Sequence, residues 1–421
     1  MFRYAAGGNY NAASSTDVSI YDGTLMAEQL LVGQPQAVGS GRHPKILVGN
    51  STIMQLFTDI AANFTFRDTV GDYLRSTQAG FLLDASEATG VMTFSGGAYA
   101  DVVITGLNDD ALHGKDGDDA LYGQDGNDVL EGGAGGDTLD GGAGIDTASY
   151  RGAGAGVIAD LSGILAGTGD EAGDTFIDIE NLTGSTFADT LIGNTGNNTL
   201  TGNGGGDALY GMGGQDRLTI TDTPFLIDGG SETDFLFVTG GGTVSLTQGA
   251  FTGIEAVYVR GDTHLDMSEV STGATIGSQS TSGHGAEIVG TSGNDSIKGG
   301  KGTDTLDGGL GNNRIQAGAG GAQIDGGMGG DKLFAGAGTD TLHVRAGFGR
   351  DNVYRFNVDT DHIAVDIAGV GAADMELKGF HDGRDTIVTF TGVEGINKII
   401  LHDVTIAQID AGPSDLFTFG A

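Results

Sequence analysis

The chain of 421 residues has no cysteine and only 4 prolines. Without cysteine it can hold neither a disulfide framework nor a thiolate metal site. No run of about 18 apolar residues occurs, so the sequence predicts no membrane-spanning helix. Basic residues number 19 against 56 acidic ones, and the net charge of −37 disfavours nucleic acid and anionic membranes as partners and favours cations.

Catalytic motifs are also missing. The sequence contains no H-E-x-x-H zinc-protease motif, no G-x-S-x-G nucleophile elbow and no G-x-x-x-x-G-K-[ST] phosphate loop. The 8 histidines are dispersed, and neighbouring carboxylates are too frequent here to indicate acid–base chemistry. We therefore expect a protein that is not an enzyme.

Glycine is abundant, at 80 residues, and it recurs with a nine-residue period rather than the three-residue period of collagen. From Gly114 the chain reads GKDGDDALY, GQDGNDVLE, GGAGGDTLD and GGAGIDTAS, a pattern of G-G-x-G-x-D-x-U-x in which U is a large aliphatic residue. Glycine allows tight turns with positive φ. One nonamer cannot bury its aliphatic residue alone, so the units must stack into a β-solenoid.

Fifteen nonamers form three arrays, at residues 105–149, 184–219 and 290–343. The sixth position is Asp in twelve of them, whereas turn propensity alone would scatter Asp, Asn and Ser over several positions. Carboxylate and amide oxygens are the ligands that Ca²⁺ prefers. We therefore predict that calcium is bound by the oxygen-bearing sixth residues, which are Asp110, Asp119, Asp128, Asp137, Asp146, Asp189, Asn198, Asp207, Asp216, Asp295, Asp304, Asn313, Asp331 and Asp340.

Two nonamers should make one turn of the coil, so side chains eighteen residues apart should stack. Adjacent coils lie about 4.8 Å apart, and two carboxylates at that distance repel by roughly 1 kcal/mol in water and roughly 3–4 kcal/mol at an effective dielectric constant of about 20. Calcium between the coils would convert this repulsion into ligation, so folding should depend on calcium. Ala322 interrupts the column from Asp304 to Asp340, and we expect weak sites beside it.

The other segments carry no nonamers. Residues 1–104 look β-rich and are a candidate for a contact or anchoring region, with strand-like segments at Ile46–Val48, Ile53–Phe57, Phe81–Leu83 and Val102–Ile104 and a helical alternative over Met54–Phe64. The spacers 150–183 and 220–289 are predicted to be wider coils of the same solenoid, or alternatively separate globular inserts. Residues 344–421 are predicted to form a β-rich cap that covers the last coil.

The nonamers resemble the calcium-binding repeat of the RTX (haemolysin-type) family of secreted bacterial proteins. The spacer end Ile179-Glu-Asn-Leu-Thr-Gly184 and the segment GFGRDNVYRFNVDTDHIAVDI also resemble RTX sequences. The resemblance implies an all-β fold, a parallel β-roll with Ca²⁺ between stacked turns and a β-rich cap. It also implies export by the type I secretion machinery through an uncleaved C-terminal signal, which Asp415-Leu-Phe-Thr-Phe resembles. The first residues lack the apolar region of a Sec signal peptide.

Together these features predict a secreted, calcium-dependent structural protein of the bacterial cell surface or extracellular matrix. It would fold, and self-assemble into a sheet like an S-layer or into a filament, when calcium binds. The alternatives are an adhesin that binds cell-surface glycans and a polysaccharide-modifying β-helix enzyme, whose reactive face would lie within residues 220–289.

Overall fold

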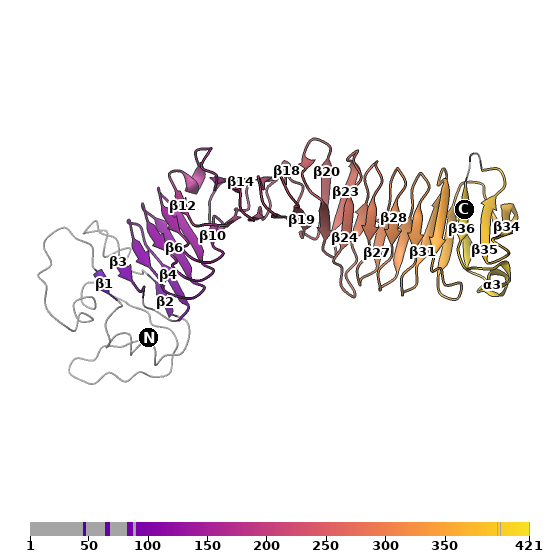
Figure 1. Cartoon of the computed structure of the whole chain (residues 1–421), viewed down its shortest axis with the longest axis horizontal. Coiled ribbons are helices and arrows are strands. Elements are labelled where there is room, and N and C mark those ends of the chain that lie inside the picture. The colour runs from indigo at the N-terminus through magenta and orange to yellow at the C-terminus, as the bar shows by residue number, and fades with distance from the viewer. Residues whose placement is uncertain are drawn as a thin grey trace, which may run out of the picture. The chain divides into compact units, whose positions relative to one another are not determined.

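The computed structural model describes residues 45–47, 64–67, 82–86, 90–393, 395 and 397–420. The chain divides into two compact units, Met1–Gly214 and Gln215–Ala421. Within each unit, short strands of successive coils lie side by side (Figure 1). The predicted strand Ile53–Phe57, and all but the last residue of the alternative helix Met54–Phe64, lie outside the described residues.

The first unit consists of short parallel strands in three stacks. One stack runs in the order β1-β3-β5-β7-β9-β12, the second includes β2-β4-β6-β8-β10-β13-β15, and the third includes β11-β14-β16. The bounds are β1 Lys45–Leu47, β2 Phe64–Arg67, β3 Leu82–Asp84, β4 Met92–Ser95, β5 Val102–Ile104, β6 Ala111–Asp116, β7 Ala120–Tyr122, β8 Val129–Ala134, β9 Thr138–Asp140, β10 Thr147–Ser149, β11 Ile158–Asp160, 3-10 helix η3 Gly169–Glu171, β12 Thr175–Ile177, β13 Asn181–Thr183, β14 Thr190–Ile192, β15 Thr199–Thr201 and β16 Ala208–Tyr210.

The second unit repeats this arrangement, with one stack that includes β17-β19-β22-β24-β26-β28-β30-β32-β36-β35-β34 and another in the order β20-β23-β25-β27-β29-β31-β33-β37. The strands β18 and β21 pair in parallel with each other. The bounds are β17 Arg217–Ile220, β18 Leu226–Asp228, β19 Phe235–Val238, β20 Thr243–Thr247, β21 Phe251–Thr252, β22 Ala256–Val259, β23 His264–Glu269, β24 Thr275–Ser278, β25 Glu287–Val289, β26 Ser296–Lys298, β27 Asp304–Asp307, β28 Arg314–Gln316, β29 Ala322–Asp325, β30 Lys332–Phe334, β31 Thr341–Arg345, β32 Arg350–Tyr354, β33 His362–Asp366, 3-10 helix η4 Ala372–Asp374, β34 Met375–Phe380, β35 Asp385–Phe390, β36 Lys398–Leu401, α3 Ile406–Ala411 and β37 Phe417–Phe419.

The eighth residues of the nonamers build the core. Leu112 pairs with Leu130 and Leu121 with Leu139, in register on neighbouring parallel strands, and all four are fully buried. Alternate side chains point to opposite faces of a strand, so the residues on either side of each leucine face outward. Ala148 continues the ladder between Leu130 and Leu182. This architecture confirms the predicted all-β, parallel β-roll.

The spacers continue the coils. In the first spacer, β12 pairs with β9 and β13 with β10, all in parallel. In the second, β22 pairs in parallel with β19, and β23 with β20. The cap differs, because β35 pairs antiparallel with both β34 and β36. The last three residues of the segment that resembles a secretion signal form β37, which pairs in parallel with β33.

Candidate metal centre

The sixth residues of the first array stack as the eighteen-residue spacing predicts. The backbone N–H of Asp110 donates to Oδ1 of Asp128 at 2.7 Å, and that of Asp128 donates to Oδ1 of Asp146 at 2.6 Å. In the second column, the N–H of Asp119 donates to Oδ1 of Asp137 at 2.7 Å. Oδ1 of each carboxylate therefore accepts a hydrogen bond from the preceding coil. The carboxylates form two columns along the array.

The other two arrays are less regular. The N–H of Asp189 donates to Asp207 at 3.0 Å, and a column of three follows in the third array, from Asp295 through Asn313 to Asp331. Four predicted residues have other neighbours. Asn198 donates through Nδ2 to the Glu180 carbonyl, Asp216 donates its N–H to Asp234, and Ala286 and Ala322 donate theirs to Asp304 and Asp340.

The columns also contain acidic residues that the sequence analysis missed. Asp101 precedes Asp119, and Asp234 follows Asp216. Both occupy the sixth position of a nonamer-like segment, at 96–104 and 229–237. Extending the period by one unit before the first array and by two units after the second finds them. The coils thus begin before residue 105. The remaining members, which accept a backbone N–H at the end of a column, come from segments without the glycine pattern; they are Asp174, Glu180, Glu255, Asp351 and Asp361.

Several of the carboxylates bury an oxygen that has no hydrogen-bond partner. This is Oδ2 of Asp119, Asp128, Asp137, Asp146, Asp234 and Asp331. The first four residues are at most 2% exposed, and none of those four forms an ion pair among the described residues. A buried carboxylate oxygen without a donor is costly, so native proteins pair such groups or place them against a metal.

Burial changes the protonation of these groups. Desolvation, together with the charges of neighbouring carboxylates such as Asp101, raises the pKa of Asp119 from its ordinary value of 3.8 to about 8. The same cause raises the pKa of Asp128 to about 7 and that of Asp137 to about 6. The ionised columns therefore require a positive partner at neutral pH.

A glycine at the first position of a nonamer leaves space beside the unpartnered oxygen. A Cβ on Gly114 would overlap Oδ2 of Asp119 and would lie 2.6 Å from the carbonyl oxygen of Gly132 on the next coil. Gly123 has the same relation to Asp128. Carboxylate and carbonyl oxygens therefore converge where only glycine fits. Calcium accepts such mixed oxygen ligands, so these residues fit the ion. Among the described residues no three His, Cys, Asp or Glu side chains converge, so carbonyls must complete any site.

These features define a parallel β-roll whose coils are joined by columns of buried carboxylates. The family model described as the RTX calcium-binding nonapeptide repeat matches residues 93–121, 113–148, 183–218, 286–315 and 310–342. The chain therefore contains RTX calcium-binding repeats, spread across residues 93–342.

Solved structures that match part of this chain include the AlgE6R3 subunit of the Azotobacter vinelandii mannuronan C5-epimerase, at 26% identity over 32% of this chain and 77% of that one, with a TM-score of 0.19. The extracellular lipase LipA from Serratia marcescens is 14% identical over 81% of this chain and 45% of that one, with a TM-score of 0.18. Both scores are low, so neither likeness bears on activity. A search of curated proteins found no match.

Proposed function

We propose that this chain is a secreted structural protein of the bacterial cell surface or extracellular matrix, and that calcium drives both its folding and its self-association. Proteins with RTX repeats are typically secreted. Among the described residues, no helix is both long and apolar enough to cross a membrane. The proposal assigns no catalytic step to the chain.

The observation that carries the proposal is the row of buried carboxylate oxygens without donors in the first array. Asp119, Asp128, Asp137 and Asp146, with carbonyl oxygens such as that of Gly132, would hold the calcium. Bound calcium supplies positive charge between coils. Without it, carboxylates on adjacent coils repel one another and oppose stacking.

Charge and strand edges support self-association. The net charge of −37 keeps calcium-free chains apart, and each bound ion neutralises two of these charges. Within the described part of the chain, β34 pairs only with β35, so its other edge offers unpaired backbone groups to a second copy. Calcium would thus lower the electrostatic repulsion between chains, and the free edge of β34 would then be able to pair with a second copy.

Analytical ultracentrifugation and electron microscopy of the full chain test this proposal. We expect monomers in chelator and ordered particles or sheets in millimolar calcium. Magnesium at the same concentration should leave the chain monomeric, because this ion dehydrates reluctantly and demands octahedral geometry. A chain that stays monomeric at high concentration in calcium would overturn the assembly proposal. Turnover of a polysaccharide by the purified protein would contradict its non-catalytic part.

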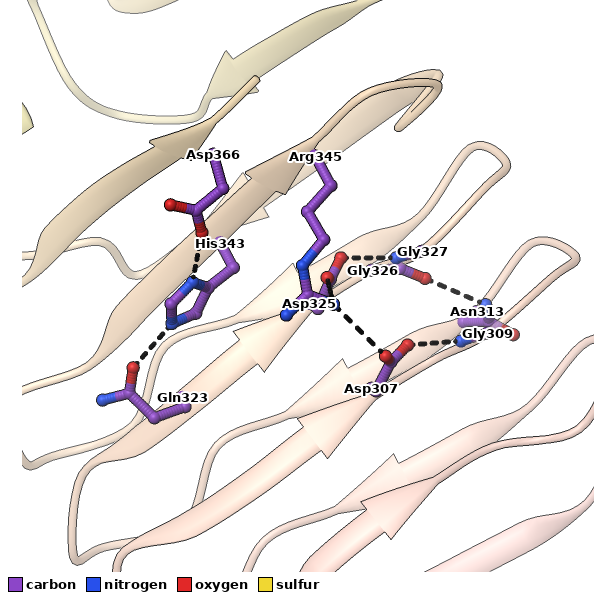
Figure 2. A network of polar contacts seen from close by, with 10 residues as sticks. All are labelled: Asp307, Gly309, Asn313, Gln323, Asp325, Gly326, Gly327, His343, Arg345 and Asp366. Carbon is purple, nitrogen blue, oxygen red and sulfur yellow. Dashed lines mark hydrogen bonds and ion pairs between the residues drawn. The ribbon is translucent and has the colours of Figure 1, made fainter. Parts of the chain in front are cut away.

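Glycan binding is a second candidate, favoured by a pocket of about 280 Å³ in the second unit. Arg345 lies between two carboxylates there, with Nη1 at 2.5 Å from Asp325 and 3.5 Å from Asp307 (Figure 2). Ser268 and Ser292 add hydroxyl groups, so the lining suits a polyhydroxylated ligand. On a glycan array we expect R345A to lose any binding of the native chain, while K332A, outside the pocket, keeps it. No binding by the native chain would exclude this candidate.

A further inference from the structure

The second residue of each nonamer adopts one of two backbone conformations. In the coils of Asp119, Asp128, Asp137 and Asp146 it has a positive φ, which is 84° at Lys115, 73° at Gln124, 101° at Gly133 and 90° at Gly142. The same holds for Gly230 before Asp234 and for Gly327 before Asp331. These six coils are the ones with an unpartnered Oδ2 named above, and we call them open coils.

In other coils the second residue lies outside the positive-φ region and caps the carboxylate. Its N–H donates to Oδ2 of the sixth residue of the same nonamer. The pairs are Gly97–Asp101 at 3.3 Å, Gly106–Asp110 at 3.4 Å, Ser185–Asp189 at 2.6 Å, Thr291–Asp295 at 2.8 Å, Gly300–Asp304 at 2.6 Å and Gly336–Asp340 at 2.7 Å. We call these capped coils. In the coil of Asp207 the second residue, Asn203, is left-handed, and the N–H of Gly204 lies 3.4 Å from Oδ2.

The conformation of the second residue decides whether Oδ2 of the carboxylate has a hydrogen-bond donor within its own coil. In a capped coil, an N–H dipole points its positive end at Oδ2 and satisfies it, so that oxygen needs no metal. In an open coil the N–H is turned away, and the buried oxygen is left without a donor. Because Oδ2 is the oxygen beside the first glycine and the carbonyl of the next coil, the cap occupies the direction from which a cation would be held.

The coil of Asn313 has a left-handed second residue like the open coils, but its sixth side chain is satisfied in a third way. Its second residue, Gly309, is left-handed at 75°. The Asn313 Oδ1 accepts the N–H of Asp295, so Nδ2 takes the place of the unpartnered oxygen and donates to the Gly326 carbonyl at 3.2 Å (Figure 2). Nδ2 also lies 3.3 Å from the Leu310 carbonyl. The amide thereby provides the positive group that calcium would provide to an aspartate.

We propose that calcium enters the open coils that carry Asp, at Asp119, Asp128, Asp137, Asp146, Asp234 and Asp331, and that capped coils and the coil of Asn313 take none. This rests on the calcium ligation proposed above. It removes Asp110, Asp189, Asp295, Asp304, Asp340 and Asn313 from the predicted metal ligands and adds Asp234. It also places four open coils in the first array and one in the third.

Matched carboxylate-to-amide variants of the full chain test the assignment. After equilibrium dialysis, bound calcium is counted for D128N, from an open coil, and for D295N, from a capped coil. We expect D128N to lose at least one ion and D295N to match the native count, with circular dichroism in saturating calcium showing that both variants fold. Loss of an ion from D295N would overturn the assignment. If D128N also keeps the native count, the calcium ligation itself fails, which is a separate result.

The reverse substitution tests the amide. N313D would create an open coil, because it places a carboxylate after a left-handed second residue. The variant should bind one more ion than the native chain and should be less stable in chelator. An unchanged count would show that the Asn313 amide does not stand in for calcium, and would overturn that part of the proposal.

A backbone variant tests the conformational rule without touching a carboxylate. Lys115 is exposed and left-handed. K115V disfavours a left-handed second residue, because a β-branched side chain rarely adopts positive φ, whereas K115N tolerates it and removes the same charge. We expect K115V to weaken one calcium site about tenfold or more, and K115N to leave it unchanged. Equal affinities in the two variants would contradict the rule.

Discussion

The first and third arrays share one repeat pattern but neutralise their buried carboxylates differently. In the first array, at residues 105–149, four carboxylates each bury an oxygen that has no hydrogen-bond partner among the described residues. In the third, at residues 290–343, the chain provides positive groups of its own, which are the backbone N–H groups that cap Asp295, Asp304 and Asp340 and the amide of Asn313, and only Asp331 has an open coil. The same nonamer can therefore build a coil that needs calcium or one that does not.

Removing calcium should separate the two arrays most strongly. In chelator at neutral pH we expect the first array to lose its structure, because its ionised columns repel, while the third array, which has one open coil at Asp331, keeps most of its structure. Hydrogen exchange measured by peptide mass spectrometry checks this, with the calcium-loaded chain as the control. Equal protection of the two arrays in chelator would show that the difference in donors has no energetic consequence.

Truncation of one core residue in each array sharpens the same comparison. Leu130 and Ile315 are both fully buried eighth residues. In calcium we expect L130A and I315A each to lower the free energy of unfolding by about 2–5 kcal/mol. In chelator only I315A should still matter, since the coil of Leu130 is already unfolded. Denaturant titrations followed by circular dichroism give the four values, and a cost of L130A that persists in chelator would contradict this account.

Acid should partly replace calcium in the first array. Folding raises the pKa of Asp119 from 3.8 to about 8, so above about pH 4 the folded coil binds protons that the unfolded chain has released. Stability of the calcium-free fold should then fall as the pH rises from about 4 to 8. Melting temperatures measured in chelator at pH 5 and pH 8 test the direction of this change in stability. We expect the melting temperature of the third array to change less than that of the first. Greater stability at pH 8 would contradict it.

Replacing Arg345 should have the smallest effect. Its side chain is 57% exposed, and exposed ion pairs contribute about 0–1 kcal/mol. We therefore expect R345A to lower the free energy of unfolding by no more than about 1 kcal/mol, and to do so equally with and without calcium. A cost that grows when calcium is removed would indicate that the guanidinium substitutes for an ion.

Most of the fold could be predicted from the nine-residue period. The aliphatic eighth position predicts the leucine ladder, and two nonamers per turn predict the stacking of Asp110 on Asp128, both of which the structure shows. These features follow from the pattern because the burial of one side chain in nine leaves the coils a single register.

The state of each carboxylate did not follow from the pattern. Lys115 and Gln124 adopt positive φ although they are not glycine, whereas Gly300 and Gly336 are glycine and do not. Glycine permits the left-handed conformation without requiring it, so the second letter of the nonamer does not tell an open coil from a capped one. Asp174 and Glu180 were missed because a spacer without the glycine pattern brings them to the columns.

Diffraction from crystals grown in calcium, with anomalous scattering to locate the ions, tests the central claim most directly. We predict calcium beside Oδ2 of Asp119, Asp128, Asp137 and Asp146, and none beside Asp304 and Asp340, where N–H caps and the interruption at Ala322 both argue against binding. Peaks of equal height at Asp304 and Asp128 would contradict the claim, because calcium would then ignore whether the chain has already satisfied the carboxylate.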